Sequence, residues 1–98
     1  MARIMTDEDD CRFEGRQVRF SDDAFTHMRY YHTDALAVCD MLKASFECPE
    51  RKKHKGIPFR STSRRVCAER NDKIFSIILD VHEHRNGPLW SVTHLKPI

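Results

Sequence analysis

Apolar and polar side chains alternate through the C-terminal half of the chain. Residues 73–84 give the clearest example, with one apolar face and one mainly polar face: Phe75, Ile77, Leu79 and Val81 against Ser76, Asp80, His82 and His84. This period of two is typical of a β-strand with one buried face. Shorter alternating segments at 17–20, 64–70 and 89–95 predict three more strands. Turn residues at 71–72 and 85–88 separate the last three, so we expect them to form an antiparallel meander.

Helical spacing replaces this alternation between the first and second predicted strands. Ser21, Asp22 and Asp23 form a helix-start signal, and Thr33-Asp34 forms another. The apolar positions that follow recur every three or four residues: Ala24, Phe25, Met28 and Tyr31 in the first helix, and Ala35, Val38, Leu42 and Phe46 in the second. Pro49 should end the second helix. The predicted order is β-α-α-β-β-β, an α+β fold with two helices packed on one face of an antiparallel sheet.

The length of 98 residues suits one domain, which we place at 15–98. Residues 1–14 are acidic and lack periodicity, so they are predicted to be a tail whose removal leaves the fold intact. No apolar run approaches the ~20 residues of a membrane span. The acidic start does not resemble a signal peptide. We therefore expect a cytoplasmic protein that does not bind membranes.

The four cysteines, Cys11, Cys39, Cys48 and Cys67, are widely separated, and no pair has CxxC spacing. In the reducing cytoplasm such residues usually serve as small buried hydrophobic side chains. We therefore predict four reduced thiols.

Positive charge is concentrated in the middle of the chain, although the net charge is only +2. A basic segment of this kind is either an ordinary solvated surface or a binding surface for a polyanion such as RNA. Both interpretations stay open. The candidate RNA-binding residues of this segment are Lys52, Lys53, Lys55, Arg60 and Arg64.

Several classes of site are excluded or weakly supported. The three glycines are dispersed, so neither a GxGxxG nor a phosphate-binding loop is present, and GxSxG is absent. His82-x-His84 places two imidazoles on one side of a strand, but a metal site would need a third ligand, for which the candidates are His94, Cys67 and Asp80. Two exposed histidines at a strand end are the simpler interpretation. We assign no metal and no cofactor.

RNA cleavage by the 2′-hydroxyl needs no metal, only a base, an acid and cations for the phosphate. The polar face of the predicted sheet offers such groups: Glu69 as base, Arg65, Arg70 and Lys73 as phosphate-binding cations, and His82, His84 and His94 as acids. The alternative is an ordinary solvated face with cross-strand Glu–Arg pairs. The face of the sheet on which His94 lies stays open. This residue alternates in step with Trp90 and Val92, and if these two pack on the helices, His94 lies at the edge of the core. Similarly, the sequence at 30–32, Tyr-Tyr-His, either stacks on a base or covers the core.

The arrangement resembles a known family. Phe20-Ser21-Asp22-Asp23-Ala24 with Met28, His32, Asp34, Val38 and Leu42, and the closing strands at 65–70, 74–81 and 90–94, resemble the small RelE-superfamily proteins of the BrnT-like branch over about residues 17–96. The resemblance implies an RNase toxin that acts on RNA and is neutralised by an antitoxin protein. It places the active site at Arg65, Glu69, Arg70 and His94, with Lys96 as an added cation. The chain departs from the family in having no tyrosine in the last strand. A non-enzymatic module that binds RNA or an acidic protein is therefore the alternative.

Overall fold

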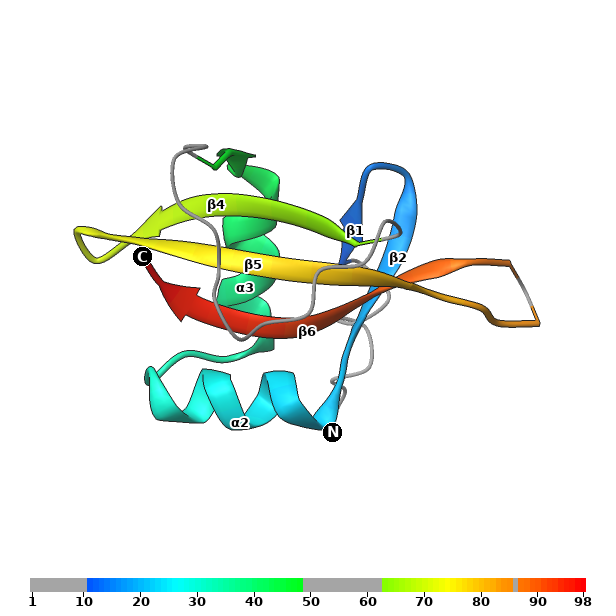
Figure 1. Ribbon diagram of the computed structural model, residues 1–98, viewed down its shortest axis with the longest axis horizontal. Coiled ribbons are helices and arrows are strands. Elements are labelled where there is room, and N and C mark those ends of the chain that lie inside the picture. The colour runs from blue at the N-terminus through cyan, green and yellow to red at the C-terminus, as the bar shows by residue number, and fades with distance from the viewer. Residues whose placement is uncertain (1–10, 49–62, 86) are drawn as a thin grey trace.

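The computed structural model describes residues 11–48, 63–85 and 87–98 (Figure 1). Its elements, in chain order, are β1 (Arg12–Phe13), β2 (Arg16–Phe20), α2 (Asp22–Tyr30), α3 (Ala35–Lys43), β3 (Phe46–Glu47), β4 (Arg64–Arg70), β5 (Lys73–His82) and β6 (Leu89–Pro97). The strands form one sheet in the order β1-β2-β6-β5-β4-β3. The predicted α+β class is confirmed, with two short strands, β1 and β3, added to the predicted order.

The predicted meander is present. β4 pairs with β5, and β5 with β6, both antiparallel and over most of their lengths. Asn71 and Asp72 join β4 to β5 with φ of 53° and 66°. Both residue types tolerate this left-handed backbone better than most others, which explains the tight turn.

Both helices start at the predicted caps. The Ser21 hydroxyl accepts a hydrogen bond from the Ala24 amide at 3.1 Å, and the Asp34 carboxylate accepts one from the Ala37 amide at 2.9 Å. Each side chain satisfies an amide that the first helical turn would otherwise leave without a partner.

The core lies between α3 and the sheet. In Figure 1, α3 crosses behind the strands and α2 runs beside β6. The buried side chains come from both helices and from the strands β1, β2, β4, β5 and β6, among them Ala24, Met28, Val38, Leu42, Val66, Ile77, Leu79, Val92 and Leu95. We call the face of the sheet opposite α3 the outer face.

One pairing was not predicted. β2 lies parallel to β6, with Val18 opposite Trp90 and Phe20 opposite Val92. Beyond this contact α2 continues along the same edge of β6, where the Leu95 amide donates to His27 Nδ1 at 3.2 Å. The helix thereby supplies an acceptor for a backbone amide of β6 at a point where the neighbouring strand, β2, has already ended.

The second helix is shorter than predicted. It ends at Lys43, and the Ser45 hydroxyl donates to the Leu42 carbonyl at 2.8 Å. Phe46, which we expected on the buried stripe, lies instead in β3, paired with Cys67 and 43% exposed. Pairing of this segment with β4 therefore stabilises the chain more than one further turn of helix would.

The predicted tail overlaps the fold. β1 forms a hairpin with β2, and Phe13 packs edge-on against Trp90 with ring centroids 6.2 Å apart. The domain therefore includes residues 11–14, and deletion through residue 12 should weaken the fold, contrary to our expectation. Residues 1–10 lie outside the described part.

The prediction of reduced thiols is wrong in this structure. Cys11 is bonded to Cys39, and Cys48 to Cys67. The cause is tertiary: the β1–β2 hairpin brings Cys11 to α3, and β3 brings Cys48 to β4. Their wide sequence spacing gave no sign of this.

No helix in the described ranges is long and apolar enough to cross a bilayer.

Candidate functional site on the outer face

The strand register arranges the outer face in rows. One row contains Arg65, Ile78 and His94, and the next contains Cys67, Ser76 and Lys96. Adjacent strands are ~4.8 Å apart and alternate residues ~6.6 Å apart, so His94 and Lys96 are neighbours and Arg65 lies two strands away. Thus Arg65 and Glu69 point away from the helices, as predicted.

Arg65 reaches from β4 toward β6. Its Nε donates to the Ser76 hydroxyl at 3.2 Å. Ser76 is only 1% exposed, whereas Arg65 is half-buried and Lys96 is exposed. The Ser76 contact therefore fixes the guanidinium over β5, and its remaining N–H groups can bind an anion.

His94 is joined on this face by a histidine from α2. The rings of His27 and His94 have centroids 5.3 Å apart. Because His27 Nδ1 accepts the Leu95 amide, its ring proton in the neutral form belongs on Nε2. The pKa of His27 is lowered, mainly by burial and then by His94, with a smaller effect of Lys96, while Asp23 acts in the opposite direction. His27 is thus held as a neutral hydrogen-bond donor beside His94.

Stability should therefore fall on mild acidification. The unfolded chain binds a proton at His27 near the ordinary pKa of 6.5, whereas the folded chain binds it only at lower pH. Between these two values the unfolded state carries more protons, so the His27 contribution, complete above about pH 7, is lost as the pH falls through the window below 6.5. We expect urea unfolding between pH 7.5 and 5 to show a steeper loss for the wild type than for His27→Asn, which keeps an acceptor but does not titrate. Parallel curves would contradict this.

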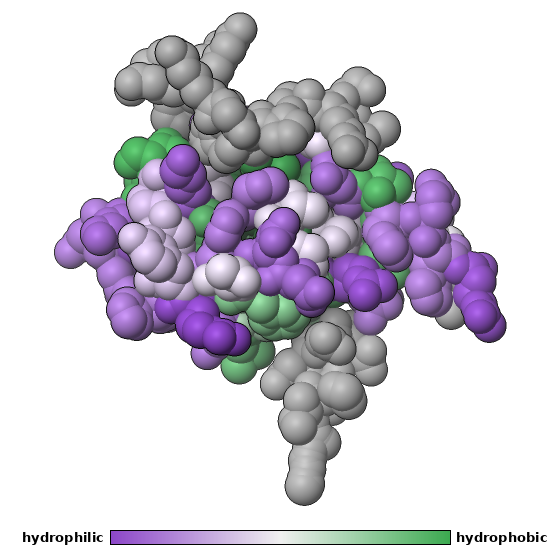
Figure 2. All heavy atoms as spheres, turned by 60° about the horizontal axis from the view of Figure 1, so that its bottom comes forward, coloured by the Kyte–Doolittle hydropathy of each residue, from purple (hydrophilic) through white to green (hydrophobic). Residues whose placement is uncertain are grey.

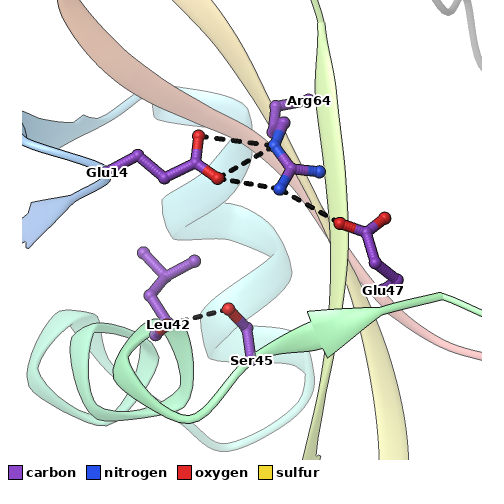
Figure 3. Close-up of polar contacts among 5 residues, drawn as sticks. All are labelled: Glu14, Leu42, Ser45, Glu47 and Arg64. Atoms are coloured by element: carbon purple, nitrogen blue, oxygen red, sulfur yellow. Dashed lines mark hydrogen bonds and ion pairs between the residues drawn. The ribbon is translucent and has the colours of Figure 1, made fainter.

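Arg64 has a structural role (Figure 3). Its Nη2 lies 2.7 Å from Glu14 and 3.2 Å from Glu47, so the guanidinium links the β1–β2 turn to β3. The hydrogen bond to Glu14 is the main cause of its raised pKa. Two carboxylates neutralise this cation, and we leave it out of the site.

The structure divides the other predicted residues. Arg70 and Lys73 are opposite each other at the β4–β5 turn, in phase with the core face. Glu69 is on the outer face but four residues from Arg65, roughly 13 Å along the strand. Among the predicted site residues that the structure describes, Arg65, His94 and Lys96 lie in two adjacent rows of the outer face, whereas Arg70 and Lys73 form a separate pair on the core side. Four predicted RNA-binding residues lie outside the described part of the chain: Lys52, Lys53, Lys55 and Arg60.

Sequence reasoning missed two features. His27 flanks the apolar stripe of its helix, and nothing in that position predicts a contact with β6. A hollow of about 650 Å³ is lined by Arg12, Arg16 and Arg19. Arg19 of β2 is paired with Ser91 of β6, and both positions lie on the outer face of the sheet. The positive charge of the outer face therefore continues across β6 to this hollow on β2. The only sequence signal was the recurrence of arginine every three or four residues.

The proposed metal ligands do not meet. Within the described residues, no three His, Cys, Asp or Glu side chains form a group that could hold an ion. Of the candidate third ligands, Cys67 is in a disulfide and Asp80 accepts from the Ser63 hydroxyl.

The face around α2 is mostly hydrophilic, and its hydrophobic residues form small separate patches (Figure 2). The surface there is suited to polar contacts.

Comparison of the chain with protein-family models, with curated proteins and with solved structures gives no match. The resemblance to the RelE superfamily stays a prediction.

Proposed function

We propose that this chain is a toxin-type protein that cleaves RNA without a metal on the outer face of its sheet. The observation that carries the proposal is the grouping of His94 with Lys96 and Arg65 beside the neutral ring of His27. His94 is the proton-transfer residue, and the two cations bind the reacting phosphate.

The grouping fits the requirements of the reaction. The 2′-oxygen attacks phosphorus, the O2′–P bond forms and the P–O5′ bond breaks, leaving a cyclic phosphate and a 5′-hydroxyl. One proton leaves O2′ and one is delivered to O5′. His94 can perform one transfer and water the other. Arg65 and Lys96 stabilise the charge on the phosphate oxygens, and the Nε2–H of His27 is suited to donate to one of them.

A non-enzymatic RNA-binding module is the second candidate. It is favoured by the position of Glu69, which is too far along β4 to act as a base beside His94. The same cations would then serve only to bind phosphates, together with Arg19 at the neighbouring hollow.

Purified protein should cleave a short unstructured RNA in the presence of a chelator. We expect His94→Ala to reduce the rate about 100-fold or more, the scale of general acid–base catalysis. Arg65→Ala should reduce both cleavage and affinity. Lys43→Ala, which removes an exposed cation from α3, is the matched control and should change neither.

The result also separates the two candidates. If the wild type binds RNA with the salt dependence of phosphate contacts but gives no cyclic-phosphate product at any concentration, the chain is a binding module. If neither binding nor cleavage occurs, both proposals fail.

An antitoxin partner is part of the proposal and rests on the resemblance. Such a protein would cover the outer face and supply carboxylates to Arg65 and Lys96, because opposite charges favour fast and specific association.

The cytoplasmic location also stays a prediction, and the two disulfides weigh against it, since disulfides persist mainly in oxidising compartments. Alkylation, under denaturing conditions, of protein taken directly from cells distinguishes the two: four reactive thiols indicate a reducing compartment, and none indicates an oxidising one.

A further inference from the structure

A second concave site lies on the other side of the sheet. This hollow of about 330 Å³ is bounded by the end of α2, by α3 and by the β4–β5 turn. We call it the tyrosine pocket, and the residues that matter here are Tyr30, Tyr31, Thr33, Arg70, Lys73 and Phe75. Its volume is at the lower end of the range for small-molecule sites, about 300–1,000 Å³.

One wall is aromatic. Tyr30 meets Tyr31 edge-on with centroids 4.8 Å apart, and Tyr31 meets Phe75 edge-on at 5.8 Å. Phe75 is buried, whereas Tyr30 is 73% exposed. A large aromatic ring left this exposed can receive a planar ligand ring by stacking.

The other wall is cationic. Arg70 and Lys73 are direct cross-strand partners, and like charges in such positions destabilise a sheet. Neither forms an ion pair with any described carboxylate, including that of neighbouring Asp72. A bound anion would remove this repulsion and would be held by two charge-assisted contacts.

A polar group in the lining also lacks a partner. Thr33 borders the pocket, and its buried Oγ1 has no hydrogen-bond partner among the described residues. A buried hydroxyl without a partner is costly, so a ligand oxygen that reaches it would be stabilised.

We infer that the tyrosine pocket binds a nucleoside monophosphate. The base would stack on the tyrosines, the phosphate would bind Arg70 and Lys73, and a ligand oxygen would satisfy Thr33. This site is separate from the RNA-cleaving site proposed above and does not depend on it.

Isothermal titration of the full chain with the four ribonucleoside 5′-monophosphates tests the inference. At least one should bind with 1:1 stoichiometry, more tightly than its nucleoside or inorganic phosphate alone. Arg70→Gln and Lys73→Gln should each raise Kd about tenfold, the effect of losing ~1.4 kcal/mol. Arg85→Gln, at the opposite end of the sheet, should leave Kd unchanged. A 5′-phosphorylated RNA compared with its 5′-hydroxyl form shows whether the phosphate of an RNA end is accepted as well; equal affinity of the two forms limits the site to free nucleotides.

Thr33→Val distinguishes a ligand contact from a merely structural residue. It should raise Tm, because an unpartnered hydroxyl is removed, and at the same time raise Kd. Binding unchanged in Thr33→Val, Arg70→Gln and Lys73→Gln would overturn the proposal, as would no binding of any nucleotide at millimolar concentration. Nucleotide binding in the tyrosine pocket requires no cleavage, so failure of the cleavage proposal would leave this one standing.

Discussion

Replacing Cys11 and Cys39 together by alanine should lower the free energy of unfolding by about 3–4 kcal/mol, as expected from the loop entropy for a disulfide that closes 28 positions. The bond joins Cys11, the residue before β1, to Cys39 of α3, and the two residues are 2% and 8% exposed. Without it, the two-residue strand β1 is held by its hairpin, by the packing of Phe13 and by the ion pair of Arg64 with Glu14 in the following turn. For a domain of this size the loss is a large fraction of the total stability.

Urea unfolding at neutral pH, followed by circular dichroism, measures the effect. The control is the same comparison in excess reductant, where wild type and double variant should become nearly equal. A difference below about 1 kcal/mol under oxidising conditions would show that this disulfide contributes little, because that is the size of an ordinary point mutation.

Ile77→Ala should cost about 2–5 kcal/mol, the usual range for such a truncation in a packed core. Ile77 is 0% exposed at the centre of β5, with strands on both sides, and belongs to the same buried cluster as Val38 and Leu42 of α3. The surrounding strands are hydrogen-bonded on both edges and can collapse into the cavity only slightly.

Ile74→Ala is the matched control for Ile77→Ala. It is the same substitution on the same strand, but Ile74 is 37% exposed on the outer face. We expect a loss within about 1 kcal/mol. Equal losses for both variants would contradict the assignment of the core to the α3 side.

The sequence predicted the elements whose signals are local. The bounds of β4 match the predicted 64–70, because alternation and the turn at 71–72 are both properties of neighbouring residues. The caps at Ser21 and Asp34 were predictable for the same reason. Contacts between distant segments could not be predicted. The β2–β6 pair, β3 and the disulfides depend on which segments of the chain meet in the fold. The periodicity of apolar residues in a single sequence carries no information about this.

The candidate site shows the same limit. Alternation correctly put Arg65 and Glu69 on the face opposite Val66, but it assigns a face and not a distance. A shift in register between Ile78 and Leu79 moves His94 to the outer face, although it shares the alternation of Trp90 and Val92. The contact of His94 with His27 then follows from the position of α2 along β6, which is a property of the tertiary structure.

The placement of β6 has a consequence for biosynthesis. This last strand lies between β2 and β5, and Val18 and Trp90, which it brings together, are 72 positions apart. An emerging nascent chain can form α2, α3 and the β4–β5 hairpin early, but β2 cannot be joined to that hairpin until β6 (Leu89–Pro97) has left the ribosome. Pairing across such a span is intrinsically slow, and until then the inner edges of β2 and β5 remain without partners. Truncated translation products that lack β6 should therefore be especially prone to association and degradation.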